Sequence, residues 1–352
     1  MIIIESAYWY LTFKCNLSCR HCLLNSSPSR DDTRDLTFEE KARLIEEFKN
    51  VGITSLRLTG GEPLFKQDTD LILRMIYENG ISYFLETNGT ILSKKTLESL
   101  IDTSDLIDNI CISLDGPDKP SHESIRGKNT FHVTLKNIER LSSHGLPVQI
   151  STTVHAGNYK RVKDIVNLAE HLSAKSVYFR FLSDWGRAKE NDMGSQMDVP
   201  LYIKIIRDIS ALSKKKRENL SIYLGSPPGI IPNNILVNIE KLCYGCDFPV
   251  IGVLPDGRIS FCGLASYYTT MVLGNFRKER IKDIWENDDT VQRLRNFGSD
   301  DLEGVCGMCI FRHQCRGSCR IDAYALFNSF LGPYPLCEKF YQEGKFPKSH
   351  LE

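Results

Sequence analysis

The sequence is organised around one stretch, Cys15-Asn16-Leu17-Ser18-Cys19-Arg20-His21-Cys22, which places three thiols within eight residues. An apolar run from Ala7 to Phe13 comes directly before it. Three thiols are one fewer than a closed four-thiolate metal site needs, so a four-iron cluster held here would keep one iron open to a further ligand. Half of a structural zinc site and one arm of a disulfide framework are the two alternatives for the same trio.

A second motif, Gly60-Gly61-Glu62-Pro63, follows a short β-rich run from Thr54 to Leu58. Two adjacent glycines let the backbone approach a ligand closely. The carboxylate of Glu62 can pair with a cationic amine. The alternative is a tight turn with a solvated glutamate, but the cysteine trio upstream favours a binding site.

The C-x3-C-x2-C spacing and the GGEP motif together resemble the radical S-adenosylmethionine (SAM) enzymes. In that family the open iron of a [4Fe-4S] cluster binds the amino and carboxylate groups of SAM. An electron from the cluster then releases a 5′-deoxyadenosyl radical, while the protein supplies orientation and exclusion of side reactions. The resemblance implies that Glu62 pairs with the methionyl nitrogen of SAM. It also places Gly60, Gly61 and Pro63 in the same cofactor-binding motif.

Six β-rich runs alternate with helical patterns in the first part of the chain. This alternation predicts right-handed βαβ units and a parallel sheet. Thr37 and Glu40 predict a capping box at the start of the first helix. The predicted fold class is α/β: a partial (β/α)6 TIM-like barrel with a C-terminal cysteine-rich domain. The predicted strands are Ala7–Phe13, Thr54–Leu58, Ile81–Leu85, Asn109–Leu114, Val148–Val154 and Val177–Leu182.

Alternation along the fourth predicted strand puts Cys111, Ser113 and Asp115 on one face, which would be the barrel interior. The family resemblance implies that Ser113 and Asp115 contact the ribose of SAM. A turn-forming Asp-Gly-Pro is the alternative for Asp115. A buried free cysteine such as Cys111 most often acts as a small hydrophobe, and the other interpretation is that it donates a hydrogen atom to a substrate radical.

Further side chains are assigned to cofactor binding by the same resemblance. Arg126, in Ile125-Arg126-Gly127, resembles a family arginine that pairs with the SAM carboxylate, bidentate in principle; a surface arginine is the alternative. Thr87 and Asn88 follow the third predicted strand and are expected to line the same pocket. His21 stands where many family members carry an aromatic residue, so we expect it to pack over the cluster or the adenine.

Cysteines dominate again near the C-terminus, around a predicted hairpin with an Asp-Gly turn at Asp256-Gly257. Their spacing resembles the SPASM domain, which carries two auxiliary [4Fe-4S] clusters. With the cluster held by Cys15, Cys19 and Cys22, this makes three expected clusters. Two zinc sites would satisfy the same count of thiols. By the ligation pattern of the family, cluster I would use Cys243, Cys246, Cys262 and Cys319, and cluster II would use Cys306, Cys309, Cys315 and Cys337.

The chain of 352 residues divides into three predicted segments. Residues 1–200 would form the radical SAM core barrel, 201–235 a linker helix and connection, and 236–352 the SPASM domain. The formal net charge is zero, with 44 basic and 44 acidic residues, which gives no electrostatic reason to expect nucleic acid or an anionic membrane as partner. The N-terminus lacks the features of a signal peptide. We therefore expect a cytoplasmic protein whose thiols stay reduced.

The predicted function is a radical SAM oxidoreductase that takes hydrogen from an unactivated C–H bond. An external donor such as a ferredoxin or flavodoxin would reduce the cluster. The first candidate substrate is a ribosomally made peptide or protein, modified by a cross-link, a thioether or dehydrogenation. Because the barrel begins almost at Met1, a separate protein or another surface would recognise such a peptide.

Two alternatives remain open. The first is an enzyme of the same family that acts on a small molecule: a sugar, an antibiotic intermediate or a tetrapyrrole side chain. The second is a non-catalytic iron–sulfur protein that carries electrons, which would need neither an open iron nor Glu62. A sulfatase-maturase role is disfavoured, because those enzymes carry an aspartate where this sequence has Gly263.

Overall fold

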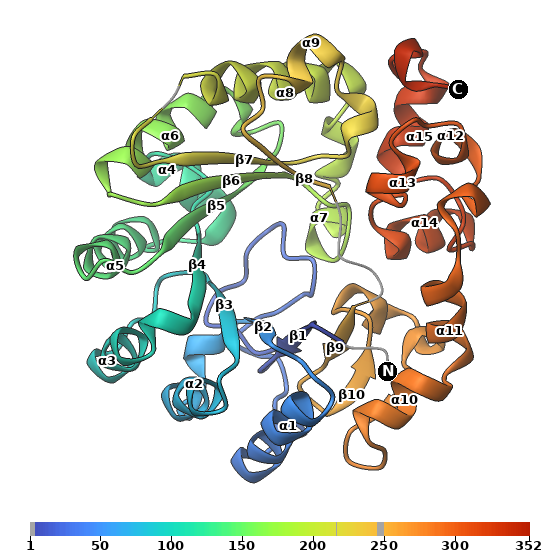
Figure 1. Cartoon of the computed structure of the whole chain (residues 1–352). Helices are drawn as coiled ribbons and strands as arrows, with labels where there is room; N and C mark the ends of the chain where they lie inside the picture. The colour runs from blue at the N-terminus through green and yellow to red at the C-terminus, as the bar shows by residue number, and fades with distance from the viewer. Residues whose placement is uncertain (1–3, 216, 245–249) are drawn as a thin grey trace.

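The computed structural model describes residues 4–215, 217–244 and 250–352. Its framework is an eleven-stranded sheet with the order β11-β10-β9-β1-β2-β3-β4-β5-β6-β7-β8 (Figure 1). Strands β1 to β8 run parallel, each paired with the next. Their bounds are β1 (Ser6–Tyr10), β2 (Ser55–Thr59), β3 (Ser82–Thr87), β4 (Ile107–Ser113), β5 (Val148–Val154), β6 (Ser176–Phe181), β7 (Ser221–Gly225) and β8 (Lys241–Cys243).

Helices cover the convex face of this curved sheet, and the loop between β1 and α1 lies inside its concave side (Figure 1). On β3, Tyr83 and Leu85 are fully buried, whereas Phe84 and Glu86 between and beyond them are only partly buried. This alternation packs an apolar face against the helices and turns a more polar face towards the concave side, which we call the lumen. The covering helices are α1 (Phe38–Asn50), α2 (Thr69–Glu78), α3 (Lys94–Asp102), α5 (Phe131–Ser143), α6 (Val162–His171) and α8 (Val199–Ser213).

The predicted α/β class, the six predicted strands and the parallel sheet are confirmed. The sheet is curved but is not closed into a full barrel. The capping box is also confirmed: Thr37 Oγ1 accepts from Glu40 N at 3.3 Å, and Glu40 Oε2 accepts from Thr37 N at 2.9 Å. Local spacing was sufficient to predict this helix start because the box is formed by residues three positions apart.

The sheet extends beyond the six predicted strands. The range 201–235, predicted as a linker, contains most of α8, all of β7 and most of the short helix α9 (Asn233–Leu236). Strand β7 pairs in parallel with β6, and β8 pairs with β7. Ile222 and Leu224 are 1% exposed, so β7 has a buried face like its neighbours. The sequence did not predict this strand, because two apolar residues are too short a pattern to indicate a buried strand face.

The C-terminal part of the chain is joined to the barrel through the sheet itself. The predicted hairpin is present as β9 (Ile251–Val253) and β10 (Arg258–Ser260), and β9 lies parallel to β1 with Ala7 opposite Ile251. No helix in the described ranges is long and apolar enough to cross a bilayer. The other α-helices and the last strand of the C-terminal part are β11 (Gly274–Asn275), α10 (Ile281–Asn287), α11 (Asp289–Asn296), α12 (Gly304–Gly307), α13 (Arg312–Cys315), α14 (Arg320–Phe327) and α15 (Pro335–Gln342).

Candidate functional site

The first three cysteines lie on the loop that enters the concave side of the sheet after β1. Cys15 and Cys19 are 7% and 8% exposed, and Cys22 is partly buried. Cys15 Sγ accepts from Leu17 N and Cys22 Sγ from Ser26 N, each at 3.4 Å. Burial raises the pKa of Cys15 to about 12. A metal must therefore displace the proton from this thiol, as cluster assembly does.

Arg187, at the start of α7 (Arg187–Glu190), is distant in sequence from the cysteine loop and holds its backbone in place. Its Nε donates to Cys19 O and its Nη2 to Ser26 O, both at 2.7 Å. A Cβ on the preceding Gly186 would lie 2.5 Å from Cys22 O. This role of Arg187 could not be predicted from the sequence, because contacts to backbone carbonyls far away in the chain leave no local motif.

Gly60 and Gly61 bring the GGEP loop against the backbone just before Cys15. Gly61 N donates to Thr12 O at 2.6 Å, and Glu62 N donates to Lys14 O at 3.0 Å. A Cβ on Gly60 would lie 2.2 Å from Thr12 O, and one on Gly61 would lie 2.1 Å from Lys14 O. In this structure the close approach is therefore between two backbone segments, and it places Glu62 beside the cysteine loop.

Gly61→Ala is expected to lower the thermal unfolding midpoint of the protein and the amount of iron it retains after reconstitution. The new methyl group would overlap a backbone oxygen, which cannot rotate away as a side chain can. We expect a destabilisation of about 2 kcal/mol or more. Gly298→Ala is the matched control, because Gly298 has a φ of −78° and the nearest atom to its Cβ would be a side-chain oxygen of Asp301 at 3.2 Å, with backbone no closer than 3.9 Å. Equal midpoints for the two variants would contradict the backbone contact.

Glu62 is fully buried and is held by three hydrogen bonds. Its Oε1 accepts from Thr87 Oγ1 at 2.7 Å and from Leu64 N at 3.1 Å, and its Oε2 accepts from Asn88 N at 2.7 Å. Asn88 Nδ2 also donates to Cys15 Sγ at 3.7 Å. Since a carboxylate can accept about four hydrogen bonds, Glu62 retains capacity for one more donor. The structure thus brings Glu62, Thr87 and Asn88 together beside the first thiol.

The affinity for SAM is expected to rise from about pH 6 to about pH 7.5, by at most about tenfold per pH unit. Burial raises the pKa of Glu62 to about 7, so the carboxylate becomes ionised and able to pair with the SAM ammonium only across this range. The folding stability of the protein without SAM changes in the opposite direction. Between the usual pKa of a glutamate and about 7, folded Glu62 binds a proton that the unfolded chain has lost, so the free energy of unfolding falls as pH rises across this range.

Equilibrium dialysis of SAM against the reconstituted protein measures this slope. Glu62→Gln should bind SAM weakly and remove the Glu62 contribution to the slope. Glu78→Gln, at an exposed position on α2, should retain it. A slope that survives in Glu62→Gln would show that another group titrates.

Asp115 is the centre of a second buried cluster of polar groups. It is fully buried, and its Oδ2 accepts from Arg126 Nε at 2.7 Å and from His21 Nε2 at 2.8 Å. Its Oδ1 accepts from Thr153 N at 2.8 Å. Burial raises the pKa of Asp115, but the charge of Arg126 and the hydrogen bonds from His21 and Thr153 outweigh burial and hold the pKa well below its usual range. The carboxylate therefore positions Arg126 and His21 as a unit.

The donors and acceptors of this cluster fit SAM. Arg126 uses Nε for Asp115, and its guanidinium carries further N–H donors that suit a carboxylate. Burial lowers the pKa of His21 more than Asp115 raises it, which favours the neutral ring. His21 Nδ1 is buried without a hydrogen-bond partner among the described residues.

Ser113 lies opposite Ser151 on the neighbouring strand and is partly buried, so its assignment to the ribose stays a prediction.

Cys111 lies on β4 at the position opposite Glu86. It is 5% exposed, and its Sγ lies 3.2 Å from Gln149 Oε1, to which the thiol donates. Burial, followed by the charge of Glu86, raises the pKa of Cys111 to about 12. The thiol therefore stays protonated, which suits both a small buried residue and a hydrogen donor. The choice between these two roles stays a prediction.

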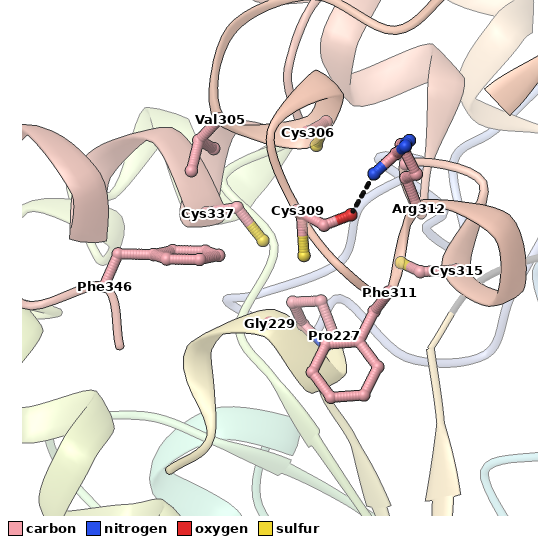
Figure 2. Close-up of a pocket in the computed structure, with 11 residues that line it drawn as sticks. Pro227, Gly229, Val305, Cys306, Cys309, Phe311, Arg312, Cys315, Cys337 and Phe346 are labelled. Atoms are coloured by element: carbon pink, nitrogen blue, oxygen red, sulfur yellow. Dashed lines mark hydrogen bonds between the residues drawn. The ribbon is translucent and has the colours of Figure 1, made fainter. Parts of the chain in front are cut away.

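Four of the C-terminal cysteines line one cavity, together with Phe311 and Phe346 (Figure 2). They are the thiols predicted to hold cluster II: Cys306, Cys309, Cys315 and Cys337. In the part of the chain that the structure describes, no three His, Cys, Asp or Glu side chains group as they would around one metal ion. A four-iron cluster instead gives each thiolate an iron of its own.

Arg320 provides a buried positive charge beside these thiols. It is 1% exposed, and its Nη1 donates to Phe330 O at 2.9 Å and to Gly332 O at 2.8 Å. Burial lowers the pKa of Arg320, and four nearby cysteines act in the opposite direction. A buried cation is costly unless negative charge lies close by, so Arg320 fits a cavity that receives an anionic thiolate-ligated cluster.

The ligands predicted for cluster I are only partly described. Cys243 ends β8, and Cys262 follows β10 by two residues. Cys319 directly precedes α14. Cys246 lies outside the described residues. The assignment of these four thiols to one cluster therefore stays a prediction.

Comparison with known proteins agrees with this geometry. The family model of the radical SAM superfamily matches residues 9–172, and that of the SPASM iron–sulfur cluster-binding domain matches residues 243–310. An AdoMet-dependent heme synthase of Methanosarcina barkeri is 31% identical over 96% of both chains. A PqqA peptide cyclase of Methylobacterium nodulans is 26% identical over 93% of this chain and 84% of its own length.

The fold also matches solved structures. Streptococcus suis SuiB bound to S-adenosylmethionine superposes with a TM-score of 0.76 and 18% identity, over 94% of this chain and 76% of SuiB. At this identity the likeness concerns the fold alone. The relatives and the two family models imply an enzyme that uses [4Fe-4S] clusters and SAM. The chain therefore belongs to the radical SAM superfamily and carries a C-terminal SPASM domain.

Proposed function

We propose that this enzyme binds a small carboxylate-bearing substrate in the lumen and oxidises it at a C–H bond. When bound, the cluster and SAM would supply a 5′-deoxyadenosyl radical. The predicted auxiliary clusters would accept the electron that the product radical loses. The observation that carries the proposal is the position of Glu62 and Asp115. Both are fully buried at the strand ends that face the cysteine loop, so groups suited to SAM lie at one mouth of a polar lumen.

The residues of the chain divide this task between them. Cys15, Cys19 and Cys22 are proposed to hold the cluster. Glu62 and Arg126 are proposed to hold the amine and the carboxylate of SAM, and so to fix its orientation. Substrate bound in the lumen is proposed to displace bulk water from it, so that a reactive radical meets the substrate before it meets solvent. A low-potential cytoplasmic donor such as a ferredoxin or flavodoxin is the proposed source of electrons.

A tetrapyrrole is the first candidate for the substrate. The relative named AdoMet-dependent heme synthase shares 31% identity across nearly the full length of both chains. Two further relatives of that name, from Oleidesulfovibrio alaskensis and Nitratidesulfovibrio vulgaris, are each 26% identical. Tetrapyrroles carry carboxylate side chains, and the guanidinium groups of Arg57 on β2 and Arg180 on β6 suit them. The sequence alone had favoured a peptide, and this evidence changes the order of the two candidates.

A ribosomally made peptide is the second candidate. The observation that favours it is the group of relatives named PqqA peptide cyclase, which align over 93% of this chain. A solved complex of SuiB with its precursor peptide SuiA shares the fold. A separate recognition protein is part of this second proposal.

The test is substrate-dependent deuterium transfer. Anaerobically reconstituted enzyme is supplied with SAM, dithionite and either a deuterated porphyrin carboxylic acid or a deuterated candidate peptide. Deuterium in 5′-deoxyadenosine, measured by mass spectrometry, identifies the substrate class from which hydrogen is taken. Label from the peptide alone would overturn the small-molecule proposal. Failure of the reconstituted enzyme to cleave SAM under any condition would favour a non-catalytic electron carrier.

A further inference from the structure

Three charged side chains in the lumen have no role in the cysteine loop or in the SAM-facing groups. They are Arg57 on β2, Glu86 on β3 and Arg180 on β6. Each stands at an inward-facing position of its strand, and the apolar residue directly before it (Leu56, Leu85 or Phe179) is fully buried. The side chains of Arg57 and Glu86 are 34% and 24% exposed, so the lumen around them is accessible. Two cations and one carboxylate give this group, the lumen triad, an excess positive charge.

Arg57 and Glu86 already neutralise each other. Arg57 Nη1 lies 3.2 Å from Glu86 Oε1, and Thr59 Oγ1 donates to Glu86 Oε2 at 2.9 Å. The guanidinium of Arg57 also stacks on Phe84, 4.8 Å from the ring centre. Both oxygens of Glu86 are therefore engaged, and the pair forms a fixed wall of the lumen.

Arg180 is the member of the lumen triad that keeps an unsatisfied hydrogen-bond donor. Its Nη2 donates to the neutral hydroxyl of Ser151 at 2.8 Å, and its guanidinium lies 5.2 Å from the ring centre of Tyr178. Its Nε is buried without a hydrogen-bond partner among the described residues. A buried donor on a charged group is costly to leave unsatisfied. A ligand that brings a negative charge would remove this cost.

The position of Arg180 connects the lumen triad with the SAM-facing groups. Arg180 lies opposite Thr153 in the β5–β6 register, and Thr153 N donates to Asp115. Glu86 lies opposite Cys111 on β4. An anion bound at Arg180 would thus sit next to the cluster of Asp115, Arg126 and His21, and carbon atoms a few bonds away from it would face the SAM end of the lumen.

We propose that Arg180, supported by the Arg57–Glu86 pair, is a subsite that binds a carboxylate of the substrate and sets which C–H bond faces SAM. This inference rests on the proposed function, since it concerns the substrate of the same lumen. A planar guanidinium binds a carboxylate through two parallel N–H donors, and Nε together with one Nη provides such a pair. The tetrapyrrole side chain is the source we favour, and an acidic peptide side chain offers the same chemistry.

The experiment compares two probes that differ only in charge, mesoporphyrin IX and its dimethyl ester, bound to reconstituted enzyme with SAM present. Porphyrin fluorescence gives the dissociation constants. Wild type is expected to bind the diacid about tenfold to a hundredfold more tightly than the ester, the usual value of a charge-assisted hydrogen bond. Arg180→Gln should lose this preference, and Arg180→Lys should keep part of it. Arg207→Gln, at an exposed position on α8, is the matched control and should behave as wild type.

Thermal unfolding gives an independent readout. Because Arg180 Nε is buried without a hydrogen-bond partner among the described residues, replacing Arg180 with glutamine is expected to leave the unfolding midpoint equal or higher, whereas loss of a merely structural arginine would lower it. A second set of binding measurements compares a peptide that carries a glutamate with the same peptide in which glutamine replaces that glutamate. A charge preference seen only in this second set would assign the subsite to a peptide.

The proposal is overturned when wild type shows no charge preference in either set of measurements, or when Arg180→Gln keeps the preference. The deuterium experiment is separate from this result. An enzyme that transfers deuterium from a substrate without any charge preference keeps its proposed function and loses only this subsite.

Discussion

Replacing Cys15, Cys19 and Cys22 together with alanine is expected to reduce SAM cleavage to the level of a protein-free control. These three thiols are the only ones predicted for the cluster that binds SAM, and Cys15 and Cys19 are buried where solvent ligands cannot replace them. Liquid chromatography of 5′-deoxyadenosine after anaerobic reduction measures the loss. Iron content should fall from about twelve to about eight per chain, because one of three four-iron clusters is removed.

A comparator removes the same number of thiols elsewhere. Cys306, Cys309 and Cys315 replaced by alanine should lose a similar amount of iron and still cleave SAM, since these residues line the other cavity. Circular dichroism of both variants checks the fold. Equal 5′-deoxyadenosine from the Cys15, Cys19, Cys22 variant and wild type would exclude the assigned cluster.

Asp115→Ala is expected to lower the free energy of unfolding by about 3–5 kcal/mol, the usual result of breaking a buried ion pair from one side. The change leaves Arg126, whose side chain is 10% exposed, without its carboxylate. Arg126 and His21 would also lose their common anchor, so the KM for SAM should rise. Thermal unfolding of the reconstituted protein and SAM-dependent kinetics measure the two effects.

Asp105→Asn, at an exposed position, is the control for Asp115 and should change stability by less than about 0.5 kcal/mol. The pH dependence gives a second check. Because the folded protein holds the pKa of Asp115 below its usual range, its contribution is present above the unfolded pKa and is lost only as pH falls through the folded value. Wild type should therefore lose more stability than Asp115→Asn on acidification. An Asp115 variant as stable as the control would contradict the cluster described here.

The local parts of this structure could be predicted from the sequence. The capping box at Thr37 depends on residues three positions apart, and the strands depend on runs of buried residues. The cysteine loop and the GGEP motif are likewise continuous stretches whose spacing alone indicates their chemistry. For such features the information lies within a few neighbouring positions.

The rest depended on contacts between distant residues. His21 and Asp115 are 94 positions apart, so the sequence suggested a ribose contact for Asp115 and gave no sign of its bond to His21. Gly60 and Gly61 pack on the backbone of residues 12–14, a contact that the sequence did not indicate, and their approach to a ligand stays a prediction. Arg180 was visible in the sequence as a charge within a β-rich run, but only the strand register shows which groups it meets.

The pairing of β9 with β1 has a consequence for how the chain is made. Strand β1 is synthesised before the other strands of the sheet, yet one of its two edges stays unpaired until Ile251 and its neighbours have been synthesised. Contacts this distant in sequence slow folding, and an uncovered strand edge invites association with other chains. A fragment that stops before β9 would keep that edge permanently, so we expect the N-terminal half expressed alone to aggregate.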